Sequence, residues 1–183
     1  MTLYVARHGE TEWNVQERYA GTTDIPLNER GLQQAETLAD KLTGLPFDVL
    51  VCSPQLRARQ TAAVITRRLG LPAAVIEELA ERHMGVYEGL TKEEVQAQYH
   101  ELWARLRERR IDDGPTGGET NRQFDARVAR ALARIREDYA GLNVLAVCHG
   151  GTALFISRQL RGLTFAEMGG FSLGNCEVAK YTL

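Results

Sequence analysis

Residues 3–9 read Leu-Tyr-Val-Ala-Arg-His-Gly, and residues 144–151 read Val-Leu-Ala-Val-Cys-His-Gly-Gly. In both stretches a short aliphatic run, typical of a buried strand, leads directly into a histidine that is followed by glycine. The carboxyl ends of parallel strands share one edge of a sheet, and open α/β sheets place their ligand crevice at that edge. We therefore expect His8 and His149, together with Arg7, at one edge of a parallel sheet.

Segments of strand type and helix type alternate along the rest of the chain, without internal repeats or an evident linker. This alternation favours an α/β fold, a three-layer α/β/α sandwich in which a sheet lies between two layers of helices. A length of 183 residues suits one domain, which we expect to span residues 1–183.

Two helix starts and one strand are marked by their local sequence. Asn28 is a suitable N-cap for a helix whose apolar residues, beginning with Leu32, recur at helical spacing. A strand is expected over residues 47–52. Residues 91–94, Thr-Lys-Glu-Glu, form a capping box that opens a helical region, which we expect to be irregular near its middle.

A further helix is expected directly after the strand at residues 47–52. Ser53 and Pro54 suit its N-cap and first-turn positions, and Gly70 suits its end. Arg57 would then lie in the first turn of that helix.

A loop followed by a longer helix is expected between residue 112 and His149. Residues 112–118 are rich in Asp, Gly and Pro, which is typical of a loop. A longer helix is expected to begin near Glu119, with an apolar face that includes Phe124. Its arginines are expected to form a solvated face and not a binding surface. They are Arg127, Arg130, Arg134 and Arg136.

The composition argues against several classes of protein. Lys and Arg number 22 against 24 Asp and Glu, and the net charge of −2 indicates no surface for nucleic acid or an anionic membrane. No run approaches the roughly 18 apolar residues of a membrane span, so we expect a cytoplasmic protein. As partners we expect a small phosphate ester and, at most, a second copy of the chain, so that the protein is a monomer or a homodimer. Cys52, Cys148 and Cys176 lie in apolar, strand-like runs and are expected to be reduced core thiols.

The arginines and histidines expected near the sheet edge, Arg7, His8, Arg57 and His149, suit the binding of a phosphoryl group. Its oxygens carry charge throughout transfer, and guanidinium groups bind such oxygens bidentately. Arg7 and Arg57 would form the clamp, with the backbone N–H of Gly150 and the side chain of Asn14 as further donors. Histidines between arginines make a poor cation site, and no carboxylate cluster has ligand spacing, so neither a metal nor another cofactor is expected.

The chain resembles the histidine phosphatase superfamily, also called the phosphoglycerate mutase-like family, along nearly its whole length. Residues 7–11, Arg-His-Gly-Glu-Thr, together with Asn14 are similar to the amino-terminal signature of that family. Further blocks follow in the order of the family, at residues 21–27, 53–61, 81–85 and 148–151. The resemblance implies a mostly parallel sheet flanked by helices.

The resemblance also implies roles that fit the chemistry of the residues. His8 would be the nucleophile that takes the phosphoryl group, and the flanking arginines disfavour its charged form. A hydrogen bond from its other ring nitrogen to a backbone carbonyl would fix its tautomer. His149 would contact the phosphoryl oxygens from the opposite side. Glu81 would protonate the leaving oxygen and then activate water. Its spacing before residues 83–85 distinguishes it from the other acidic candidates, which are Glu77, Glu78, Glu88 and Glu119.

Contacts to the substrate are implied for a further set of residues. Those expected to bind the substrate are Asn14, Gly21, Thr22, Arg82 and Gly150. Those that could contact the leaving group are Tyr19, Thr22, Arg82, Met84, Trp103 and Arg109.

Three departures separate this chain from the mutases of the family. Ala20 stands where mutases usually carry a hydroxyl residue, Met84 stands where they usually carry a tyrosine, and less chain follows Glu81. All three favour a phosphatase that acts on small phosphate esters. Residues 115–120 resemble a loop of broad-specificity members and of those that act on α-ribazole phosphate. A phosphoglycerate mutase is the alternative enzyme, and a catalytically silent module that binds phosphorylated ligands is the alternative of a different class.

Overall fold

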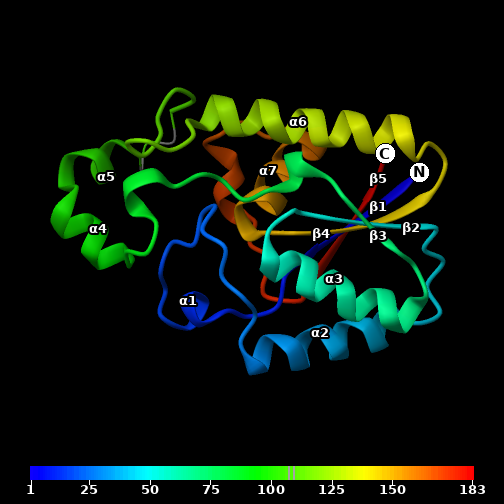
Figure 1. Cartoon of the computed structure of the whole chain (residues 1–183). Helices are drawn as coiled ribbons and strands as arrows, with labels where there is room; N and C mark the ends of the chain where they lie inside the picture. The colour runs from blue at the N-terminus through cyan, green and yellow to red at the C-terminus, as the bar shows by residue number, and fades with distance from the viewer. Residues whose placement is uncertain (107, 109) are drawn as a thin grey trace.

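The computed structural model describes residues 1–106, 108 and 110–183, and its centre is a five-stranded sheet (Figure 1). The strands run in the order β3-β2-β4-β1-β5. Strands β1 to β4 are parallel, and β5 is antiparallel to β1. Their bounds are β1 Thr2–Arg7, β2 Val49–Cys52, β3 Ala73–Val75, β4 Asn143–Cys148 and β5 Val178–Thr182. The expected α/β fold with a mostly parallel sheet is confirmed.

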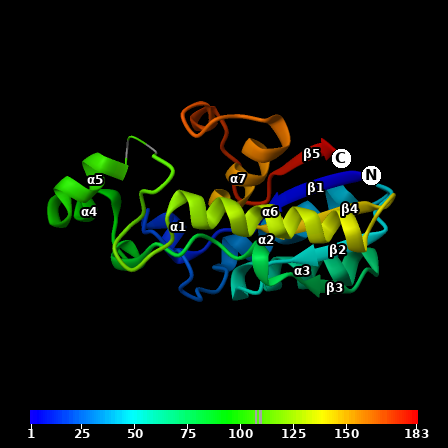
Figure 2. The same cartoon turned by 90° about the horizontal axis from the view of Figure 1, so that it is seen from above.

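Helices cover both faces of the sheet. Helices α2 (Glu29–Leu42) and α3 (Leu56–Leu69) pack on one face, and α6 (Asn121–Asp138) and α7 (Gly150–Arg161) pack on the other (Figure 1). Each layer encloses its own cluster of buried apolar side chains against the sheet. Helices α4 (Lys92–Gln98) and α5 (His100–Leu106) lie beyond the sheet at one end of the molecule (Figure 2).

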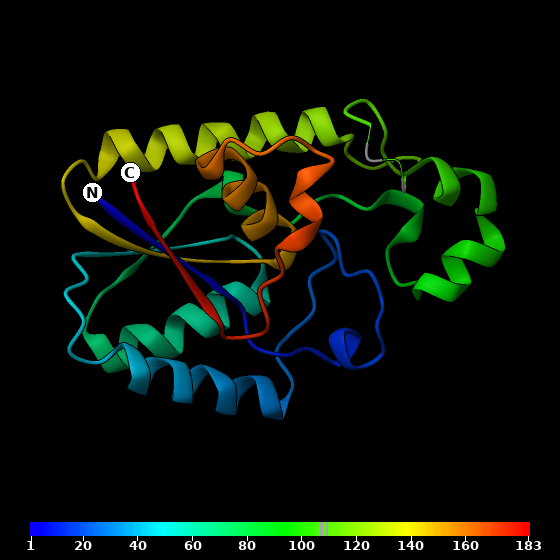
Figure 3. The ribbon, with the colours of Figure 1, turned by 180° about the vertical axis from the view of Figure 1, so that it is seen from behind.

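The register of the sheet determines which residues share an edge. In the parallel pairs, Arg7 lies opposite Cys148, and Cys52 lies opposite Val147. Three neighbouring strands therefore end at almost the same level, on the side of the sheet away from the chain termini. The two termini lie near each other at the opposite end of the sheet (Figure 3).

Short elements connect the layers. They are the helix α1 (Glu12–Val15) and the 3-10 helices η1 (Glu77–Leu79), η2 (Gly85–Tyr87) and η3 (Glu167–Gly170). Among the helices of the residues described above, none is long and apolar enough to cross a membrane.

The predicted start of α2 is confirmed, and one of its core residues is not. The Asn28 side chain accepts a hydrogen bond from the Gly31 N–H and caps the helix. The later apolar residues, among them Ala35 and Leu38, are buried. Leu32 is 43% exposed, because it lies on the edge of the apolar stripe in the first turn.

The predicted start of α3 is wrong by two residues. The helix begins at Leu56 with Gln55 as N-cap, and Ser53 and Pro54 lie before it. The Ser53 hydroxyl does not cap the helix, because it contacts a histidine described below. Arg57 does lie in the first turn, and Gly70 ends the helix in the left-handed conformation with φ 71°.

The capping box at residues 91–94 is confirmed, and the helical region breaks at Tyr99 into α4 and α5. Residues 112–118 contain no helix or strand, as expected. Helix α6 begins two residues after Glu119, with Thr120 as its N-cap.

The predicted solvated arginine face of α6 is partly wrong. Arg130, Arg134 and Arg136 are exposed. The side chain of Arg127 is only 16% exposed and contacts Glu119, because position 127 lies on the side of the helix that faces the η1 segment.

The three cysteines are free thiols. Cys52 and Cys148 are buried at the ends of β2 and β4, as expected, and burial raises the pKa of Cys52 to about 11. Cys176 does not lie in a strand. It is half-buried in a turn, with a positive φ of 56°.

Candidate active site

The carboxyl edge of the sheet brings the two histidines together. The N–H of His8 donates to the Cys148 carbonyl over 3.0 Å, which continues the pairing of β1 with β4. The ring centroids of His8 and His149 lie 5.1 Å apart, and both side chains are buried. The sequence prediction that both histidines lie at one sheet edge is confirmed.

The ring of His8 is held in one tautomer. Its Nδ1 lies 2.7 Å from the Gly9 carbonyl oxygen, which can only accept, so Nδ1 carries the proton. Nε2 therefore has a free lone pair, and it accepts a hydrogen bond from Nε of Arg57 over 3.2 Å. Burial, followed by the charge of Arg57, lowers the pKa of His8 well below its ordinary value. The result is a neutral imidazole with an unprotonated Nε2.

Two guanidinium groups flank this ring, that of the buried Arg57 and that of the half-buried Arg7. Arg57 is 1% exposed, and its terminal nitrogens donate to the carbonyls of Gly21 and Thr23 over 2.8 and 2.9 Å. Arg7 donates from Nη1 to the Leu173 carbonyl over 2.9 Å. Burial lowers the pKa of both arginines, but an arginine pKa starts so high that both remain charged.

His149 is the N-cap residue of α7, and its ring contacts the residue that follows β2. Its Nε2 lies 2.6 Å from the Ser53 hydroxyl, at the end of β2. Burial, and then the charge of Arg57, lowers the pKa of His149 well below its ordinary value. A Cβ on Gly150 would lie 3.6 Å from the Arg7 guanidinium carbon, so the first turn of α7 lies directly beside that arginine.

Two buried polar atoms beside the histidines have no hydrogen-bond partner within residues 1–106, 108 and 110–183. They are Nε of Arg7 and Nδ1 of His149. Buried polar atoms in proteins are nearly always hydrogen-bonded. Unpartnered atoms at a sheet edge that is rich in positive charge are therefore suited to an anionic ligand.

Glu81 lies at the N-terminus of α7. Its carboxylate accepts hydrogen bonds from the Gly151 N–H over 2.9 Å and from the Arg82 N–H over 2.8 Å. The Thr152 hydroxyl lies 3.4 Å from the same carboxylate. Glu81 thus reaches the sheet edge beside His149.

The other acidic candidates have different positions. Glu88 binds the N–H and hydroxyl groups of Thr22 and Thr23. Burial raises the pKa of Glu88, but these hydrogen bonds outweigh it and the net pKa is lowered. Glu119 pairs with Arg127, and Glu78 lies near Arg134.

A cavity of about 350 Å³ opens over these residues, and we call it the histidine cavity. Most of the predicted site residues line it, namely Arg7, His8, Asn14, Gly21, Arg57, Glu81, Arg82 and Gly150. His149 is fully buried and does not line the cavity itself, although its neighbour Gly150 does. Thr22 lines a neighbouring cavity of about 720 Å³, which shares Glu81 with the histidine cavity.

Apart from Thr22, the described candidates for the leaving group line the histidine cavity or a smaller cavity beside it. Tyr19, Arg82 and Met84 line the histidine cavity and also a smaller cavity of about 190 Å³ beside it. Trp103 lines only the smaller one. Arg109 lies outside the described residues.

Two of the predicted binding residues are partly occupied by other contacts. The Asn14 amide oxygen accepts from the Thr11 N–H and from the side chain of Asn175, which leaves its amide nitrogen as the donor for a ligand. The Arg82 guanidinium donates to the carbonyls of Glu119 and Asp113, so it holds the loop beside the cavity.

Sequence reasoning missed four residues that organise the site. Ser53 contacts His149, and Asn175 donates to the His8 carbonyl over 2.9 Å. Gln55 donates to the Gly21 carbonyl and accepts from the Glu81 N–H. The fourth is Arg127. Two of them carried a signal: Ser53 follows β2 as the histidines follow β1 and β4, and Arg127 has the spacing of the buried face of α6.

No group of three or more His, Cys, Asp or Glu side chains that could hold a metal ion is found among the residues that the structure describes.

Known proteins resemble this chain in sequence and in structure. The "Adenosylcobalamin/alpha-ribazole phosphatase" of Escherichia coli K12 is 34% identical over 173 residues, which covers 92% of this chain and 83% of that protein. The "2,3-bisphosphoglycerate-dependent phosphoglycerate mutase 2" of Gloeobacter violaceus is 35% identical over 167 residues, 88% of this chain and 76% of that protein. The crystal structure of a putative alpha-ribazole-5'-P phosphatase from Escherichia coli superposes with a TM-score of 0.90 at 31% identity, over 98% of this chain and 89% of that one.

A family model also matches almost the entire sequence. The model describes the histidine phosphatase superfamily (branch 1), and it covers residues 3–183, which include both histidines, Arg7, Arg57 and Glu81. The chain is therefore a member of the histidine phosphatase superfamily, branch 1.

Proposed function

We propose that this chain is a metal-independent phosphomonoesterase that hydrolyses small phosphate esters through a phosphohistidine on His8. The observation that carries the proposal is the state of the His8 ring. Its Nδ1 is bound to the Gly9 carbonyl, and its unprotonated Nε2 faces the guanidinium of Arg57 at the cavity wall. A neutral nitrogen beside two fixed positive charges is suited to attack a bound phosphate.

In the first step, His8 Nε2 attacks phosphorus and the bond from phosphorus to the ester oxygen breaks. Glu81 gives a proton to the leaving oxygen, so that an alcohol departs. In the second step, Glu81 takes a proton from water as the water oxygen attacks phosphorus. The P–N bond breaks, its electron pair returns to Nε2, and inorganic phosphate leaves.

The charge on the phosphoryl oxygens is balanced by fixed donors throughout. Arg7 and Arg57 supply guanidinium groups, and Arg7 Nε has no partner among the described residues. His149, the Gly150 N–H and the Asn14 amide nitrogen supply further contacts around the same group. These donors are positioned before the substrate binds, which is the condition under which electrostatic stabilisation is largest.

Two features support water as the acceptor of the phosphoryl group. Ala20 and Met84 both line the histidine cavity, and neither carries a hydroxyl group that could hold phosphoglycerate. A mutase must retain its sugar acid and exclude water until phosphate is returned. The relatives named as alpha-ribazole phosphatases make α-ribazole 5′-phosphate the first specific substrate to test.

The test compares hydrolysis with transfer. The purified protein should release inorganic phosphate from a panel of phosphomonoesters, with no requirement for 2,3-bisphosphoglycerate. Interconversion of 2- and 3-phosphoglycerate that is faster than phosphate release, and that needs bisphosphate priming, would refute the proposal.

A further inference from the structure

Arg127 is the arginine of α6 that contacts the main chain around Glu81. Its Nη1 donates to the carbonyls of Glu78 and Ala80 over 3.0 and 2.7 Å, and its Nη2 donates to the Glu81 carbonyl over 3.1 Å. These carbonyls lie within η1 or directly after it, and a short helix leaves its last carbonyls without internal partners. One guanidinium therefore binds three carbonyls within four residues.

The same guanidinium forms a two-pronged ion pair with Glu119. Nε and Nη2 of Arg127 lie 2.8 and 2.6 Å from the two carboxylate oxygens. One of these oxygens also accepts the N–H of His83 over 2.9 Å. Burial raises the pKa of Glu119, but the hydrogen bonds from Arg127 and His83 outweigh it, so the net pKa is lowered and the carboxylate is charged. The pair thus holds the chain on both sides of residue 81.

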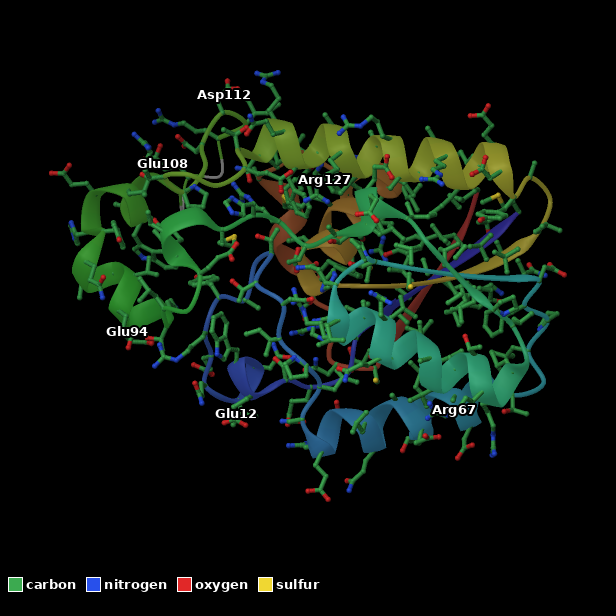
Figure 4. The ribbon with its side chains drawn as sticks, viewed as in Figure 1. Glu12, Arg67, Glu94, Glu108, Asp112 and Arg127 are labelled. Atoms are coloured by element: carbon green, nitrogen blue, oxygen red, sulfur yellow. The ribbon has the colours of Figure 1, made fainter. Side chains whose placement is uncertain are left out.

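Arg127 is more enclosed than Arg130, Arg134 and Arg136, the exposed arginines of the same helix. Figure 4 shows Arg127 on the inner side of α6, whereas the labelled Glu94, Glu108 and Asp112 lie at the periphery. Its guanidinium also lies over the Phe124 ring, 4.8 Å from the centroid. An arginine that is held on this many sides has little freedom to move.

We propose that Arg127 is a positioning residue for Glu81, and this inference rests on the acid role proposed above for Glu81. The Glu81 N–H is fixed by Gln55 over 2.7 Å, and its carbonyl is fixed by Arg127. With both ends of the residue held, the carboxylate stays at the N-terminus of α7, bound to the Gly151 N–H. Loss of Arg127 frees the carbonyl side, and a displacement of about 1 Å at a catalytic group can cost about 100-fold in rate.

Only a planar guanidinium group can make all of these contacts at once. Arginine has five N–H donors in fixed geometry, whereas lysine has one ammonium group on a flexible stem. Arg127→Lys should therefore restore part of what Arg127→Gln removes. Arg136, exposed on the same helix, supplies the matched control as Arg136→Gln.

The experiment measures kcat/KM for an alkyl phosphate and for p-nitrophenyl phosphate. A poor alkoxide leaving group needs the proton of Glu81, whereas p-nitrophenolate leaves without it. We expect Arg127→Gln to lose about 10- to 100-fold on the alkyl phosphate and less than about 3-fold on p-nitrophenyl phosphate. Arg127→Lys should lie between Arg127→Gln and the unmodified protein, and Arg136→Gln should match the unmodified protein on both substrates.

A second comparison separates this inference from the proposed function. In a Glu81→Gln background, adding Arg127→Gln should cause no further loss on the alkyl phosphate, because both changes remove the same proton transfer. Equal losses on both substrates, or losses that multiply in the double variant, would overturn the positioning role. If Glu81→Gln slows both substrates equally, Glu81 is not the acid, and the inference about Arg127 is then wrong as well. If Arg127→Gln does not fold, Arg127→Lys provides the same comparison. If neither folds, Arg127 is a structural residue and the inference is wrong.

Discussion

Gly151→Ala tests the position of Glu81 with the smallest possible change. A Cβ at residue 151 would lie 2.5 Å from one Glu81 carboxylate oxygen and 3.2 Å from the other, whereas ordinary contacts begin at 3.4 Å. The carboxylate must therefore retreat by about 1 Å, a displacement that can cost about 100-fold in rate. We expect a loss of that size in kcat/KM on an alkyl phosphate, with a much smaller loss on p-nitrophenyl phosphate.

The same change should leave the fold intact. The atom that must move is the end of a flexible side chain, and Gly151 lies in the first turn of α7, where alanine favours a helix by up to about 1 kcal/mol over glycine. The midpoint of thermal unfolding should therefore stay within about 4 °C of the unmodified protein. Gly170→Ala is the control, because a Cβ there meets nothing within 4 Å. Unchanged hydrolysis of the alkyl phosphate by Gly151→Ala would refute the reasoning, and so would equal losses on both substrates.

Three further predictions concern the acid, the histidines and metal ions. Glu81→Gln should slow hydrolysis of an alkyl phosphate by about 10²- to 10⁴-fold and that of p-nitrophenyl phosphate far less; equal losses would leave Glu81 a structural role. Burial, and then the charge of Arg57, lowers the pKa of His8 and His149 well below 6.5, so the unfolded chain binds more protons than the folded one below that pH. The free energy of unfolding should fall on acidification from about pH 6.5, by up to about 1.4 kcal/mol per pH unit for each histidine. Thermal unfolding at a series of pH values measures this dependence. His149→Gln should make it shallower, and His100→Gln should leave it unchanged. Treatment with a chelator should leave the rate unchanged, and a large loss that added Mg²⁺ restores would contradict the metal-independent site.

The parts of the site that follow strands could be predicted from the sequence. Arg7, His8 and His149 stand directly after aliphatic runs, and the parallel pairing of β1 with β4 places such residues at the same level. Arg57 lies in the first turn of the helix that follows β2. In these cases a local pattern is enough to place the residue, because the carboxyl ends of parallel strands lie at one edge of the sheet.

The contacts that hold the site together were not predicted, because they join residues far apart in the sequence. The residue type of Ser53 favours a helix cap, but its hydroxyl contacts His149, 96 residues away. The charge of Arg127 alone favours a solvated face. Its spacing was a signal against that assignment, since it lies three residues after Phe124 and four before Ala131, both buried.

The central claim is that the phosphoryl group passes through His8, and trapping that intermediate tests it most directly. The protein should be mixed briefly with a ³²P-labelled substrate, quenched in base and mapped by peptide. Base preserves a phosphoramidate, and acid cleaves its P–N bond. We predict that base-stable, acid-labile label lies on His8 and is absent from His8→Ala, which should also lose activity by several orders of magnitude. Label on a serine or cysteine, or full activity in His8→Ala, would contradict the account.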